Sequence, residues 1–413
     1  MSSDDVEAGL LALSVPPDPG CSGRVIQSSL VTLRKHLGMD VAFVGRFSSG
    51  CRVFEYVDAA SPCCPIRPGG DDPTEETYCG RVVEGLIPQL IRDAGEEPGV
   101  ADLAATRELP VGAHLSVPLT RMTGEVLGTL CCFSYEPDHT LRERDLRLMR
   151  MFAELVSAHM ETLLQHEDRV GRVRARVREV IEQGGPAIAV QPIVALERLE
   201  AVGYEALSRF PAGPDVDGFA DAWDPARWFH EAQRAGMSAE LETAAVTNAL
   251  AVLGYLPDAA FLSVNLSGAT LCHPSTADLL LGANPPRLIV ELTEHVPISN
   301  YLSLAGPLAR LRDAGVRLAV DDAGSGYAGL EHILRLRPDI VKLDRFLITG
   351  VTKHPGRRAL VTAMTGFARE MGVELVAEGI ETAQDVETLL ELGVRLGQGF
   401  HLGRPSLDLL RSA

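Results

Sequence analysis

Carboxylates recur near the C-terminal ends of short apolar runs in the second half of this 413-residue chain. Glu205, Glu291, Asp321 and Glu378 each lie at or near the end of such a run. One carboxylate at a strand end commonly solubilises a loop or caps a helix, so only the occurrence of several together indicates a functional site. Carboxylates that meet at one point repel one another and stay ionised only where cations lie among them. The pattern therefore indicates a cation site.

The residue types at these positions favour one kind of chemistry. Oxygen ligands from Asp, Glu and Asn suit hard octahedral ions, so we expect Mg²⁺ or Mn²⁺ rather than zinc. Two such ions activate a water molecule and hold a phosphate oxygen, while a lysine adds positive charge and a further carboxylate accepts the water's proton. Together the side chains predict hydrolysis of a phosphodiester at a two-metal site. The other polar residues at the predicted strand ends are Asn265, Glu294, Asp322, Lys342, Glu381 and Gln398.

Eight apolar runs with helical stretches between most of them must position these side chains. Their number and spacing predict a (β/α)8 barrel, in which the active site lies at the C-terminal ends of the strands. Only residues 197–201 separate the first two runs, which is too short for a parallel crossover, so the first strand should be antiparallel to the second. The predicted strands are Ala187–Leu196, Val202–Phe210, Phe261–Leu266, Leu288–Leu292, Arg317–Val320, Ile340–Leu343, Glu374–Ala377 and Leu396–Leu402.

The first 140 residues predict a small α/β module. Apolar residues recur with helical spacing over Val25–Leu37, and a short helix is expected around Glu76–Val83. Two pairs of strand-like segments, each joined by a turn that contains glycine, predict hairpins of one antiparallel sheet. The four expected strands are Val41–Phe47, Cys51–Val57, His114–Leu119 and Val126–Phe133.

A long helix is expected over residues 141–184, between the two parts. The segment contains no proline, and its seam of mostly apolar residues recurs in steps of three and four from Met149 to Val180. This heptad pattern is typical of a helix that packs along one narrow stripe. We therefore expect a homodimer in which the stripe meets its copy.

The bulk composition disfavours several classes of protein. Thirty-eight basic against 56 acidic residues give a formal charge of -18, which disfavours binding to a nucleic-acid polymer. Eight cysteines are too few for a disulfide scaffold in a chain of this length, so we expect a reducing, cytoplasmic location. The N-terminus is acidic where a secretory signal is basic, and no run of about 18 apolar residues occurs, so no membrane span is expected.

The segment from about Pro186 to Pro405 resembles the EAL family of cyclic di-GMP phosphodiesterases. The family's tripeptide stands here as Glu205-Ala206-Leu207, which alone would mean little because three common residues recur by chance. Seven further motifs follow the family's order and together argue against coincidence. They are QPIV from Gln191, NLS from Asn265, ELTE from Glu291, DDAGSGY from Asp321, VKLDR from Val341, VAEGIET from Val376 and GQGFHLGRP from Gly397.

The resemblance implies a metal site and a reaction. The implied ligands of the first metal are Glu205, Asn265, Glu291 and Asp321, and Asp322 helps to bind the second. The implied reaction opens one phosphodiester of cyclic di-GMP and gives linear pGpG.

The remaining matched residues have implied roles around this centre. Lys342 would hold the nucleophilic water, and Glu378 would be the general base. Gln191, Arg209 and Gln398 would contact the dinucleotide. The residues with an implied loop or regulatory role are Glu294, Gly324, Gly326 and Glu381.

The loop after the paired aspartates departs from the family pattern. Ala323 stands where the family has Phe, and Ala328-Gly329 stand where it has two serines. Loss of the aromatic side chain would loosen the loop and slow turnover without removing a metal ligand. The alternative to an active hydrolase is therefore a slow or inactive cyclic di-GMP receptor or scaffold.

The first part of the chain resembles a GAF domain, a sensor module. The resemblance rests on its architecture and on GAHLSVPL from Gly112 and GEVLGTLCCFS from Gly124. We therefore expect a GAF-like sensor over residues 20–140, a signalling helix over 141–184 and an EAL barrel over 185–413, with the sensor regulating the barrel. The sequence does not show what the sensor binds. Its cysteines, Cys79 among them, are expected to be buried and inert, with redox or chromophore chemistry as the alternative.

Overall fold

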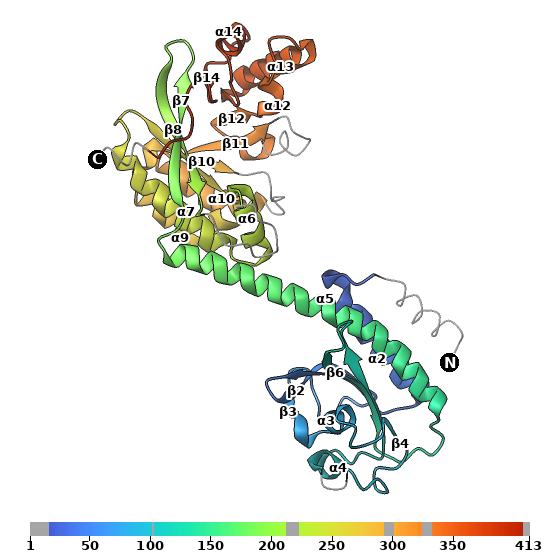
Figure 1. Cartoon of the computed structure of the whole chain (residues 1–413). Coiled ribbons are helices and arrows are strands. Elements are labelled where there is room, and N and C mark those ends of the chain that lie inside the picture. The colour runs from blue at the N-terminus through green and yellow to red at the C-terminus, as the bar shows by residue number, and fades with distance from the viewer. Residues whose placement is uncertain (1–15, 101–102, 212–222, 293–300, 324–332, 408–413) are drawn as a thin grey trace. The chain divides into compact units, whose positions relative to one another are not determined.

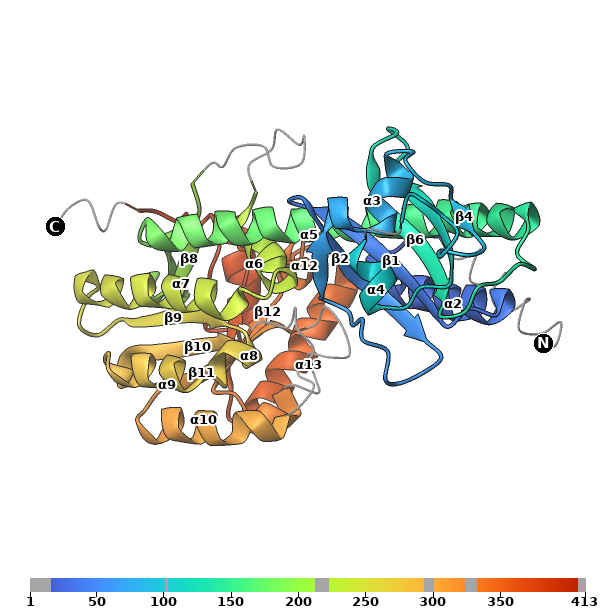
Figure 2. The same cartoon turned by 90° about the horizontal axis from the view of Figure 1, so that it is seen from below.

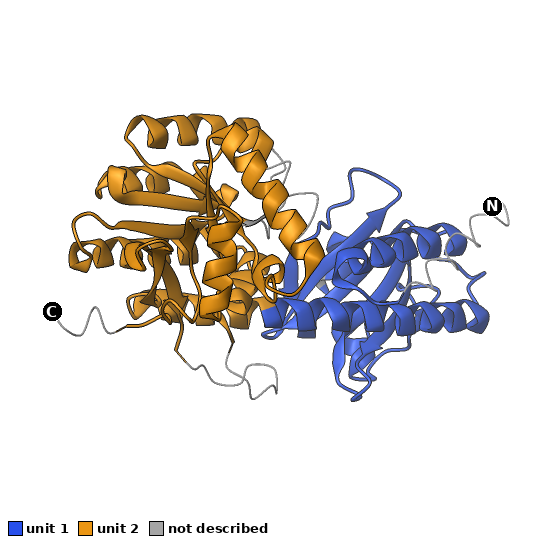
Figure 3. Ribbon diagram, turned by 90° about the horizontal axis from the view of Figure 1, so that it is seen from above, with its two compact units in different colours: residues 1–169 blue, residues 170–413 orange. Residues whose placement is uncertain are grey.

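The computed structural model describes residues 16–100, 103–211, 223–292, 301–323 and 333–407. It forms two compact units, residues 1–169 (unit 1) and 170–413 (unit 2), which Figure 3 shows in separate colours. Helix α5 (Glu143–Glu182) contributes residues 143–169 to unit 1 and the rest to unit 2 (Figure 1). The predicted long helix is therefore confirmed.

A six-stranded antiparallel sheet forms the centre of unit 1, in the order β3-β2-β1-β6-β5-β4. This confirms the predicted module and adds two short edge strands, β3 and β4, that the sequence pattern did not reveal. The strands are β1 (Val41–Ser48), β2 (Cys51–Ala59), β3 (Asp71–Pro73), β4 (Leu90–Ile91), β5 (Ala113–Thr120) and β6 (Val126–Ser134). The other described helices of unit 1 are α2 (Pro19–Leu37), the 3-10 helix η1 (Thr74–Glu76), α3 (Tyr78–Val83) and α4 (Ala104–Glu108).

Helix α2 shows how local sequence sets an element of unit 1. The Asp18 side chain caps it by accepting a hydrogen bond from the Gly20 backbone N–H, and Pro19 occupies the first turn. Gly38 ends the helix in a left-handed conformation, with φ of 67°. The helix packs in the core with the sheet and α5, where its buried side chains include Ile26, Leu30 and Leu33.

Eight strands close into a barrel in unit 2, in the order β10-β11-β12-β13-β14-β7-β8-β9. The first strand, β7, is antiparallel to both β8 and β14, whereas the other neighbouring pairs are parallel. The predicted barrel with an antiparallel first strand is therefore confirmed. The strands are β7 (Ala187–Ala195), β8 (Glu200–Arg209), β9 (Phe261–Leu266), β10 (Leu288–Leu292), β11 (Arg317–Ala323), β12 (Ile340–Leu343), β13 (Glu374–Ala377) and β14 (Leu396–Gly397).

Helices cover the barrel, and Figure 2 shows α7, α9 and α10 beside strands β9, β10 and β11. The described helices are α6 (Pro225–Arg234), α7 (Ser238–Val252), η2 (Leu253–Tyr255), α8 (Gly268–Leu271), α9 (Pro274–Leu281), η3 (Pro285–Arg287), α10 (Tyr301–Asp313), α12 (Arg345–Ile348), α13 (Pro355–Met371) and α14 (Ala383–Glu391). No helix in the described ranges is long and apolar enough to cross a membrane.

The apolar stripe of α5 is buried inside the chain at both of its ends. In unit 1 its residues in the core are Met149, Phe152 and Val156. In unit 2 they are Val173, Val177 and Val180, which pack with Trp223 and Trp228. The heptad spacing thus predicted a buried stripe, but both ends of it have partners in the same chain. A 3-4 period marks a buried helix face and does not specify what covers it.

Candidate active site

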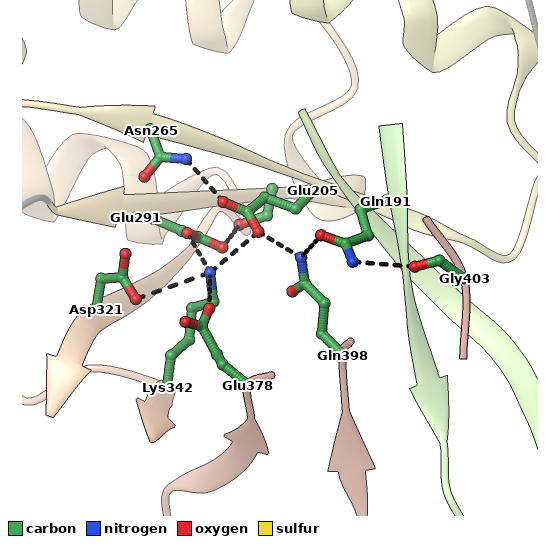
Figure 4. A network of polar contacts seen from close by, with 10 residues as sticks. Gln191, Glu205, Asn265, Glu291, Asp321, Lys342, Glu378, Gln398 and Gly403 are labelled. Atoms are coloured by element: carbon green, nitrogen blue, oxygen red, sulfur yellow. Dashed lines mark hydrogen bonds and ion pairs between the residues drawn. The ribbon is translucent and has the colours of Figure 1, made fainter. Parts of the chain in front are cut away.

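Lys342 lies among the carboxylates at the ends of the barrel strands (Figure 4). Its Nζ is 2.6 Å from Glu378 Oε1, 2.8 Å from Glu291 Oε2 and 3.2 Å from Glu205 Oε2. Asp321 Oδ1 lies 3.8 Å away. Lys342 and Glu291 are each only 1% exposed, and Glu205 is 6% exposed. The structure therefore brings together four of the predicted acidic residues around one buried ammonium.

Amide side chains fix Glu205 from two further sides. Asn265 Nδ2 donates to Glu205 Oε1 at 3.0 Å, and Gln398 Nε2 donates to Glu205 Oε2 at 2.7 Å. Gln398 Nε2 also lies 2.9 Å from Gln191 Oε1, and Gln191 Nε2 donates to the backbone oxygen of Gly403 at 3.0 Å. This chain of contacts, drawn in Figure 4, holds four of the predicted metal-binding or substrate-contacting side chains in one network.

The register of the parallel strands explains why these side chains meet. Glu291 of β10 pairs with Asn265 of β9, and Glu205 of β8 pairs with Ser263 of β9. Strands β11, β12 and β13 continue the same parallel arrangement around the barrel. Because the carboxyl ends of parallel strands meet at one face, residues far apart in sequence reach a common centre.

Sequence reasoning missed Ser263, whose Oγ donates to Glu291 Oε1 at 2.5 Å. Ser263 is fully buried and lies two residues before Asn265 on β9. Residues at i and i+2 of a strand share a face, so the position of Asn265 was a signal for Ser263. A serine carries no charge, so a pattern of strand-end carboxylates does not include it.

Burial and mutual repulsion shift the ionisation of the site. Burial, with repulsion from Glu205, raises the pKa of Glu291 to about 8 against the attraction of Lys342. Burial also raises the pKa of Glu378 to about 7. Burial acts the same way on Glu205, but the Lys342 charge and the two amide hydrogen bonds outweigh it and lower the pKa of Glu205. Burial opposes the charge of Lys342, yet the surrounding carboxylates raise its pKa well above the ordinary value.

A cavity of about 430 Å³ opens beside these side chains. Glu205, Asn265 and Asp321 line it together with residues of α6 and α7. Arg209 also lines it, and its Nη1 donates to the backbone oxygen of Ser208 at 2.9 Å. The volume falls within the roughly 300–1,000 Å³ typical of small-molecule sites.

Of the remaining predicted residues, Glu381 lies outside the Lys342 network, and three loop residues lie outside the described ranges. Glu381 is about half exposed, and its Oε1 accepts a hydrogen bond from Arg345 Nη2 at 2.5 Å. Asp322 belongs to strand β11. The predicted loop residues that lie outside the described residues are Glu294, Gly324 and Gly326.

The donor set fits a hard divalent cation. The acidic groups around Lys342 are carboxylates, and their oxygens and that of Asn265 are of the kind that Mg²⁺ and Mn²⁺ prefer. One ammonium against four carboxylates leaves an excess of negative charge, which bound cations would offset. Across the described ranges, no three His, Cys, Asp or Glu side chains are spaced as ligands around a common point. The Lys342 ammonium lies among the carboxylates instead.

Family comparison places this site in a known group of proteins. The EAL domain model matches residues 174–405, which is more than half of the chain. The chain belongs to the EAL family. The matched segment of this EAL protein contains the whole Lys342 network, and the GAF domain model matches residues 23–160, which include the sheet of unit 1.

Two curated relatives align with most of this EAL protein. PdeB of Escherichia coli, named a probable cyclic di-GMP phosphodiesterase, is 29% identical over 366 residues, which are 82% of this chain and 63% of PdeB. An uncharacterized signaling protein of Caulobacter vibrioides is 25% identical over 345 residues, which are 82% of this chain and 40% of the relative. The chain therefore spans less than two thirds of the length of either relative.

Solved structures of EAL proteins share the fold of unit 2. The PaMucR phosphodiesterase, solved as a c-di-GMP complex, is 27% identical with a TM-score of 0.50 and covers 58% of this chain and 99% of its own. MucR of Pseudomonas aeruginosa is named a bifunctional diguanylate cyclase/cyclic di-GMP phosphodiesterase. The EAL domain of Xanthomonas citri FimX, in complex with c-diGMP, is 19% identical with a TM-score of 0.50 over 59% of this chain and 96% of its own, and shows the fold alone.

Proposed function

We propose that this protein is a metal-dependent phosphodiesterase that hydrolyses cyclic di-GMP to linear pGpG, regulated by its GAF domain. The observation that carries the proposal is the convergence of Glu205, Glu291, Asp321 and Glu378 on Lys342, beside a cavity of ligand size. The names of PdeB and of the PaMucR complex support the substrate class.

The acidic and amide side chains would hold the metal ions. In the proposal, Glu205, Asn265, Glu291 and Asp321 bind one Mg²⁺ or Mn²⁺, and Asp322 shares a second. These ions supply positive charge that polarises the phosphodiester and makes the attacking water more acidic. Strands β8, β9 and β10 of the closed barrel hold Glu205, Asn265 and Glu291 in place before substrate binds, which lowers the cost of ordering them.

Lys342 and Glu378 would orient and deprotonate the attacking water. Glu378 accepts its proton as general base, and its carboxylate is held by the Lys342 ammonium at 2.6 Å. A lysine has three N–H donors, and the carboxylates of Glu205, Glu291 and Glu378 lie within 3.2 Å of Nζ. When Glu205 and Glu291 bind the metal instead, the ammonium would be left with donors for the water. Lys342 therefore orients both the water and the group that deprotonates it.

Gln191, Gln398 and Arg209 would bind the dinucleotide. Gln398 Oε1 is buried and, within the described residues, has no hydrogen-bond partner. A buried carbonyl oxygen without a donor is costly, so a ligand N–H at this point would stabilise it. Arg209 lines the cavity and supplies a positive charge for the anionic substrate.

A paired measurement of binding and turnover tests this proposal. With Mn²⁺ or Mg²⁺, Glu205→Ala should lower the rate of pGpG formation at least a hundredfold, because it removes a direct metal ligand. The control is Glu391→Gln, because the Glu391 side chain is 68% exposed. This variant should hydrolyse cyclic di-GMP at the wild-type rate. If the wild type binds cyclic di-GMP tightly and leaves it intact over hours, the protein is a receptor or scaffold and the catalytic proposal is wrong.

A further inference from the structure

Two cysteine thiols meet in the buried core of unit 1. Cys79 of α3 and Cys131 of β6 place their Sγ atoms 3.1 Å apart, although 52 residues separate them in sequence. Both residues are fully buried, and both are free cysteines. A disulfide has an S–S distance of about 2.05 Å, so an approach of only about 1 Å separates this contact from a covalent bond.

Contacts with Cys131 and with a buried arginine make Cys79 the more acidic of the two thiols. Arg52 Nη1 donates to Cys79 Sγ at 3.3 Å, and the guanidinium lies over the rings of Phe43 and Phe54. Burial raises the pKa of Cys79, but the hydrogen bond from Cys131 and the Arg52 charge outweigh it and lower the pKa to about 6. Cys79 is therefore the thiolate of the pair at neutral pH.

The second thiol stays protonated and faces the first. Burial raises the pKa of Cys131 well above its ordinary value, and the Cys79 charge acts in the same direction. Ser116 Oγ lies 3.1 Å from Cys131 Sγ, and Thr129 Oγ1 lies 3.3 Å from it. The site thus pairs a nucleophilic thiolate with a thiol in contact, which is the arrangement of an attacking and a resolving cysteine.

Cys132, the next residue in the sequence, has neither a lowered pKa nor, among the described residues, a second thiol in contact. Cys132 alternates to the opposite face of β6, where it is also fully buried and its Sγ lies 3.8 Å from Met149 Sδ. Burial raises the pKa of Cys132 to about 12. Cys132 is therefore an internal reference of equal burial and different surroundings.

We propose that Cys79 and Cys131 form a redox-active pair that converts reversibly between a dithiol and an intramolecular disulfide, with hydrogen peroxide as the class of oxidant. The inference concerns unit 1 alone and does not rest on the phosphodiesterase proposal. The sequence predicted that the cysteines of this domain are inert. The proposal changes that expectation for Cys79 and Cys131 and keeps it for Cys132.

The chemistry balances in two steps. The Cys79 thiolate attacks one peroxide oxygen, the O–O bond breaks, and the leaving hydroxide takes a proton to form water while Cys79 becomes a sulfenic acid. Cys131 then attacks the Cys79 sulfur, the S–S bond forms, and the sulfenic oxygen leaves as a second water with the Cys131 proton. Because both thiols are fully buried, this reaction requires that hydrogen peroxide reach the core of unit 1. An external dithiol reduces the bond by exchange.

Peptide mapping of the full-length protein tests the pairing. Reduced protein is treated with a small molar excess of hydrogen peroxide, unfolded, alkylated and digested. We expect a disulfide-linked peptide pair that joins Cys79 to Cys131, removed by dithiothreitol and formed equally in Cys132→Ala. Alkylation of Cys79 and Cys131 to the same extent as Cys132 would overturn the proposal, as would a linkage of either one to a different cysteine.

The role of Arg52 is tested by rate rather than by yield. Arg52→Met keeps much of the apolar stem and removes the charge, so disulfide formation at pH 7 should slow at least tenfold as the thiolate fraction falls. Arg52→Lys keeps the charge and should retain more of the rate than Arg52→Met. Equal rates in wild type and Arg52→Met, with circular dichroism showing both folded, would overturn the activation of Cys79 by Arg52.

Discussion

At the residue scale, Lys342 governs the electrostatics of the candidate active site. It is buried and lies within 3.2 Å of Glu205, Glu291 and Glu378. Charges removed from water are tolerated only when they are paired, and loss of one partner leaves the others uncompensated. The site therefore needs positive charge for stability as well as for chemistry.

Replacing this lysine should make the barrel depend on metal ions. In a chelator, Lys342→Met should lower the free energy of unfolding of unit 2 by about 3–5 kcal/mol, and Mg²⁺ or Mn²⁺ should restore part of the loss. Both tryptophans of the chain, Trp223 and Trp228, lie in unit 2, so their fluorescence in a urea titration follows this unit. Lys353→Met, at an exposed position, is the control. A chelator-treated Lys342→Met variant as stable as the control would contradict this account.

His114 should make unit 1 sensitive to mild acid. It is buried beside Tyr78, with ring centroids 4.7 Å apart, and burial lowers its pKa from 6.5 to about 3. Between these two values the unfolded chain binds a proton at His114 that the folded chain does not. The contribution of neutral His114 to the stability of unit 1 is therefore complete above pH 6.5 and is lost as the pH falls toward 3.

The size of this effect can be measured by substitution. As the pH falls from 7 to 5, His114 should lower the free energy of unfolding of unit 1 by about 2 kcal/mol. The variant His114→Phe should not show this loss. Hydrogen exchange of β5 peptides across a urea series at each pH reports the stability of unit 1. The same decrease in wild type and His114→Phe would show that His114 is not the titrating group.

At the element scale, an aromatic cage holds the C-terminal part of α5 in place within unit 2. The Arg176 guanidinium lies 4.5 Å from the Trp223 ring centroid and 4.7 Å from that of Trp228. Trp228 stacks on Phe210, which directly follows the substrate-contact candidate Arg209, with ring centroids 4.7 Å apart. The helix is thereby packed against the chain segment that carries one wall of the cavity.

Removing the caged charge should weaken unit 2 without touching the Lys342 network. Arg176→Met retains an apolar stem and loses two cation–π contacts, so we expect unit 2 to lose about 1–2 kcal/mol. Arg178→Met on the exposed face of the same helix should change stability by less than about 0.5 kcal/mol. Urea unfolding followed by tryptophan fluorescence compares the two. Equal stability of the two variants would show that the cage contributes nothing.

At the scale of the whole molecule, the sequence determined most of the barrel because its signals are local. Each strand is a short apolar run, and the carboxyl ends of parallel strands meet, so Glu205, Glu291 and Asp321 could be brought together without coordinates. Lys342 could be assigned to the same strand ends, but the position of its ammonium could not. That Lys342 Nζ lies among the carboxylates follows from the barrel's closure, which no local pattern encodes.

The sequence was less informative where an element is short or its partner is distant. Strands β3 and β4 span two or three residues, too few for a period of two to show. The stripe of α5 was recognised but its partners were not, because Val177 meets Trp228 only after the chain has folded back. For the same reason Cys79 and Cys131 did not stand out as a pair.

The most direct test of the proposed function is hydrolysis by the wild-type protein with and without metal. Cyclic di-GMP is incubated with the full chain in a chelator, in Mg²⁺ or in Mn²⁺, and the nucleotides are separated by anion-exchange chromatography. We predict linear pGpG in either metal and intact substrate in the chelator. Intact cyclic di-GMP under all three conditions, or the same rate of pGpG formation with and without chelator, would contradict the account.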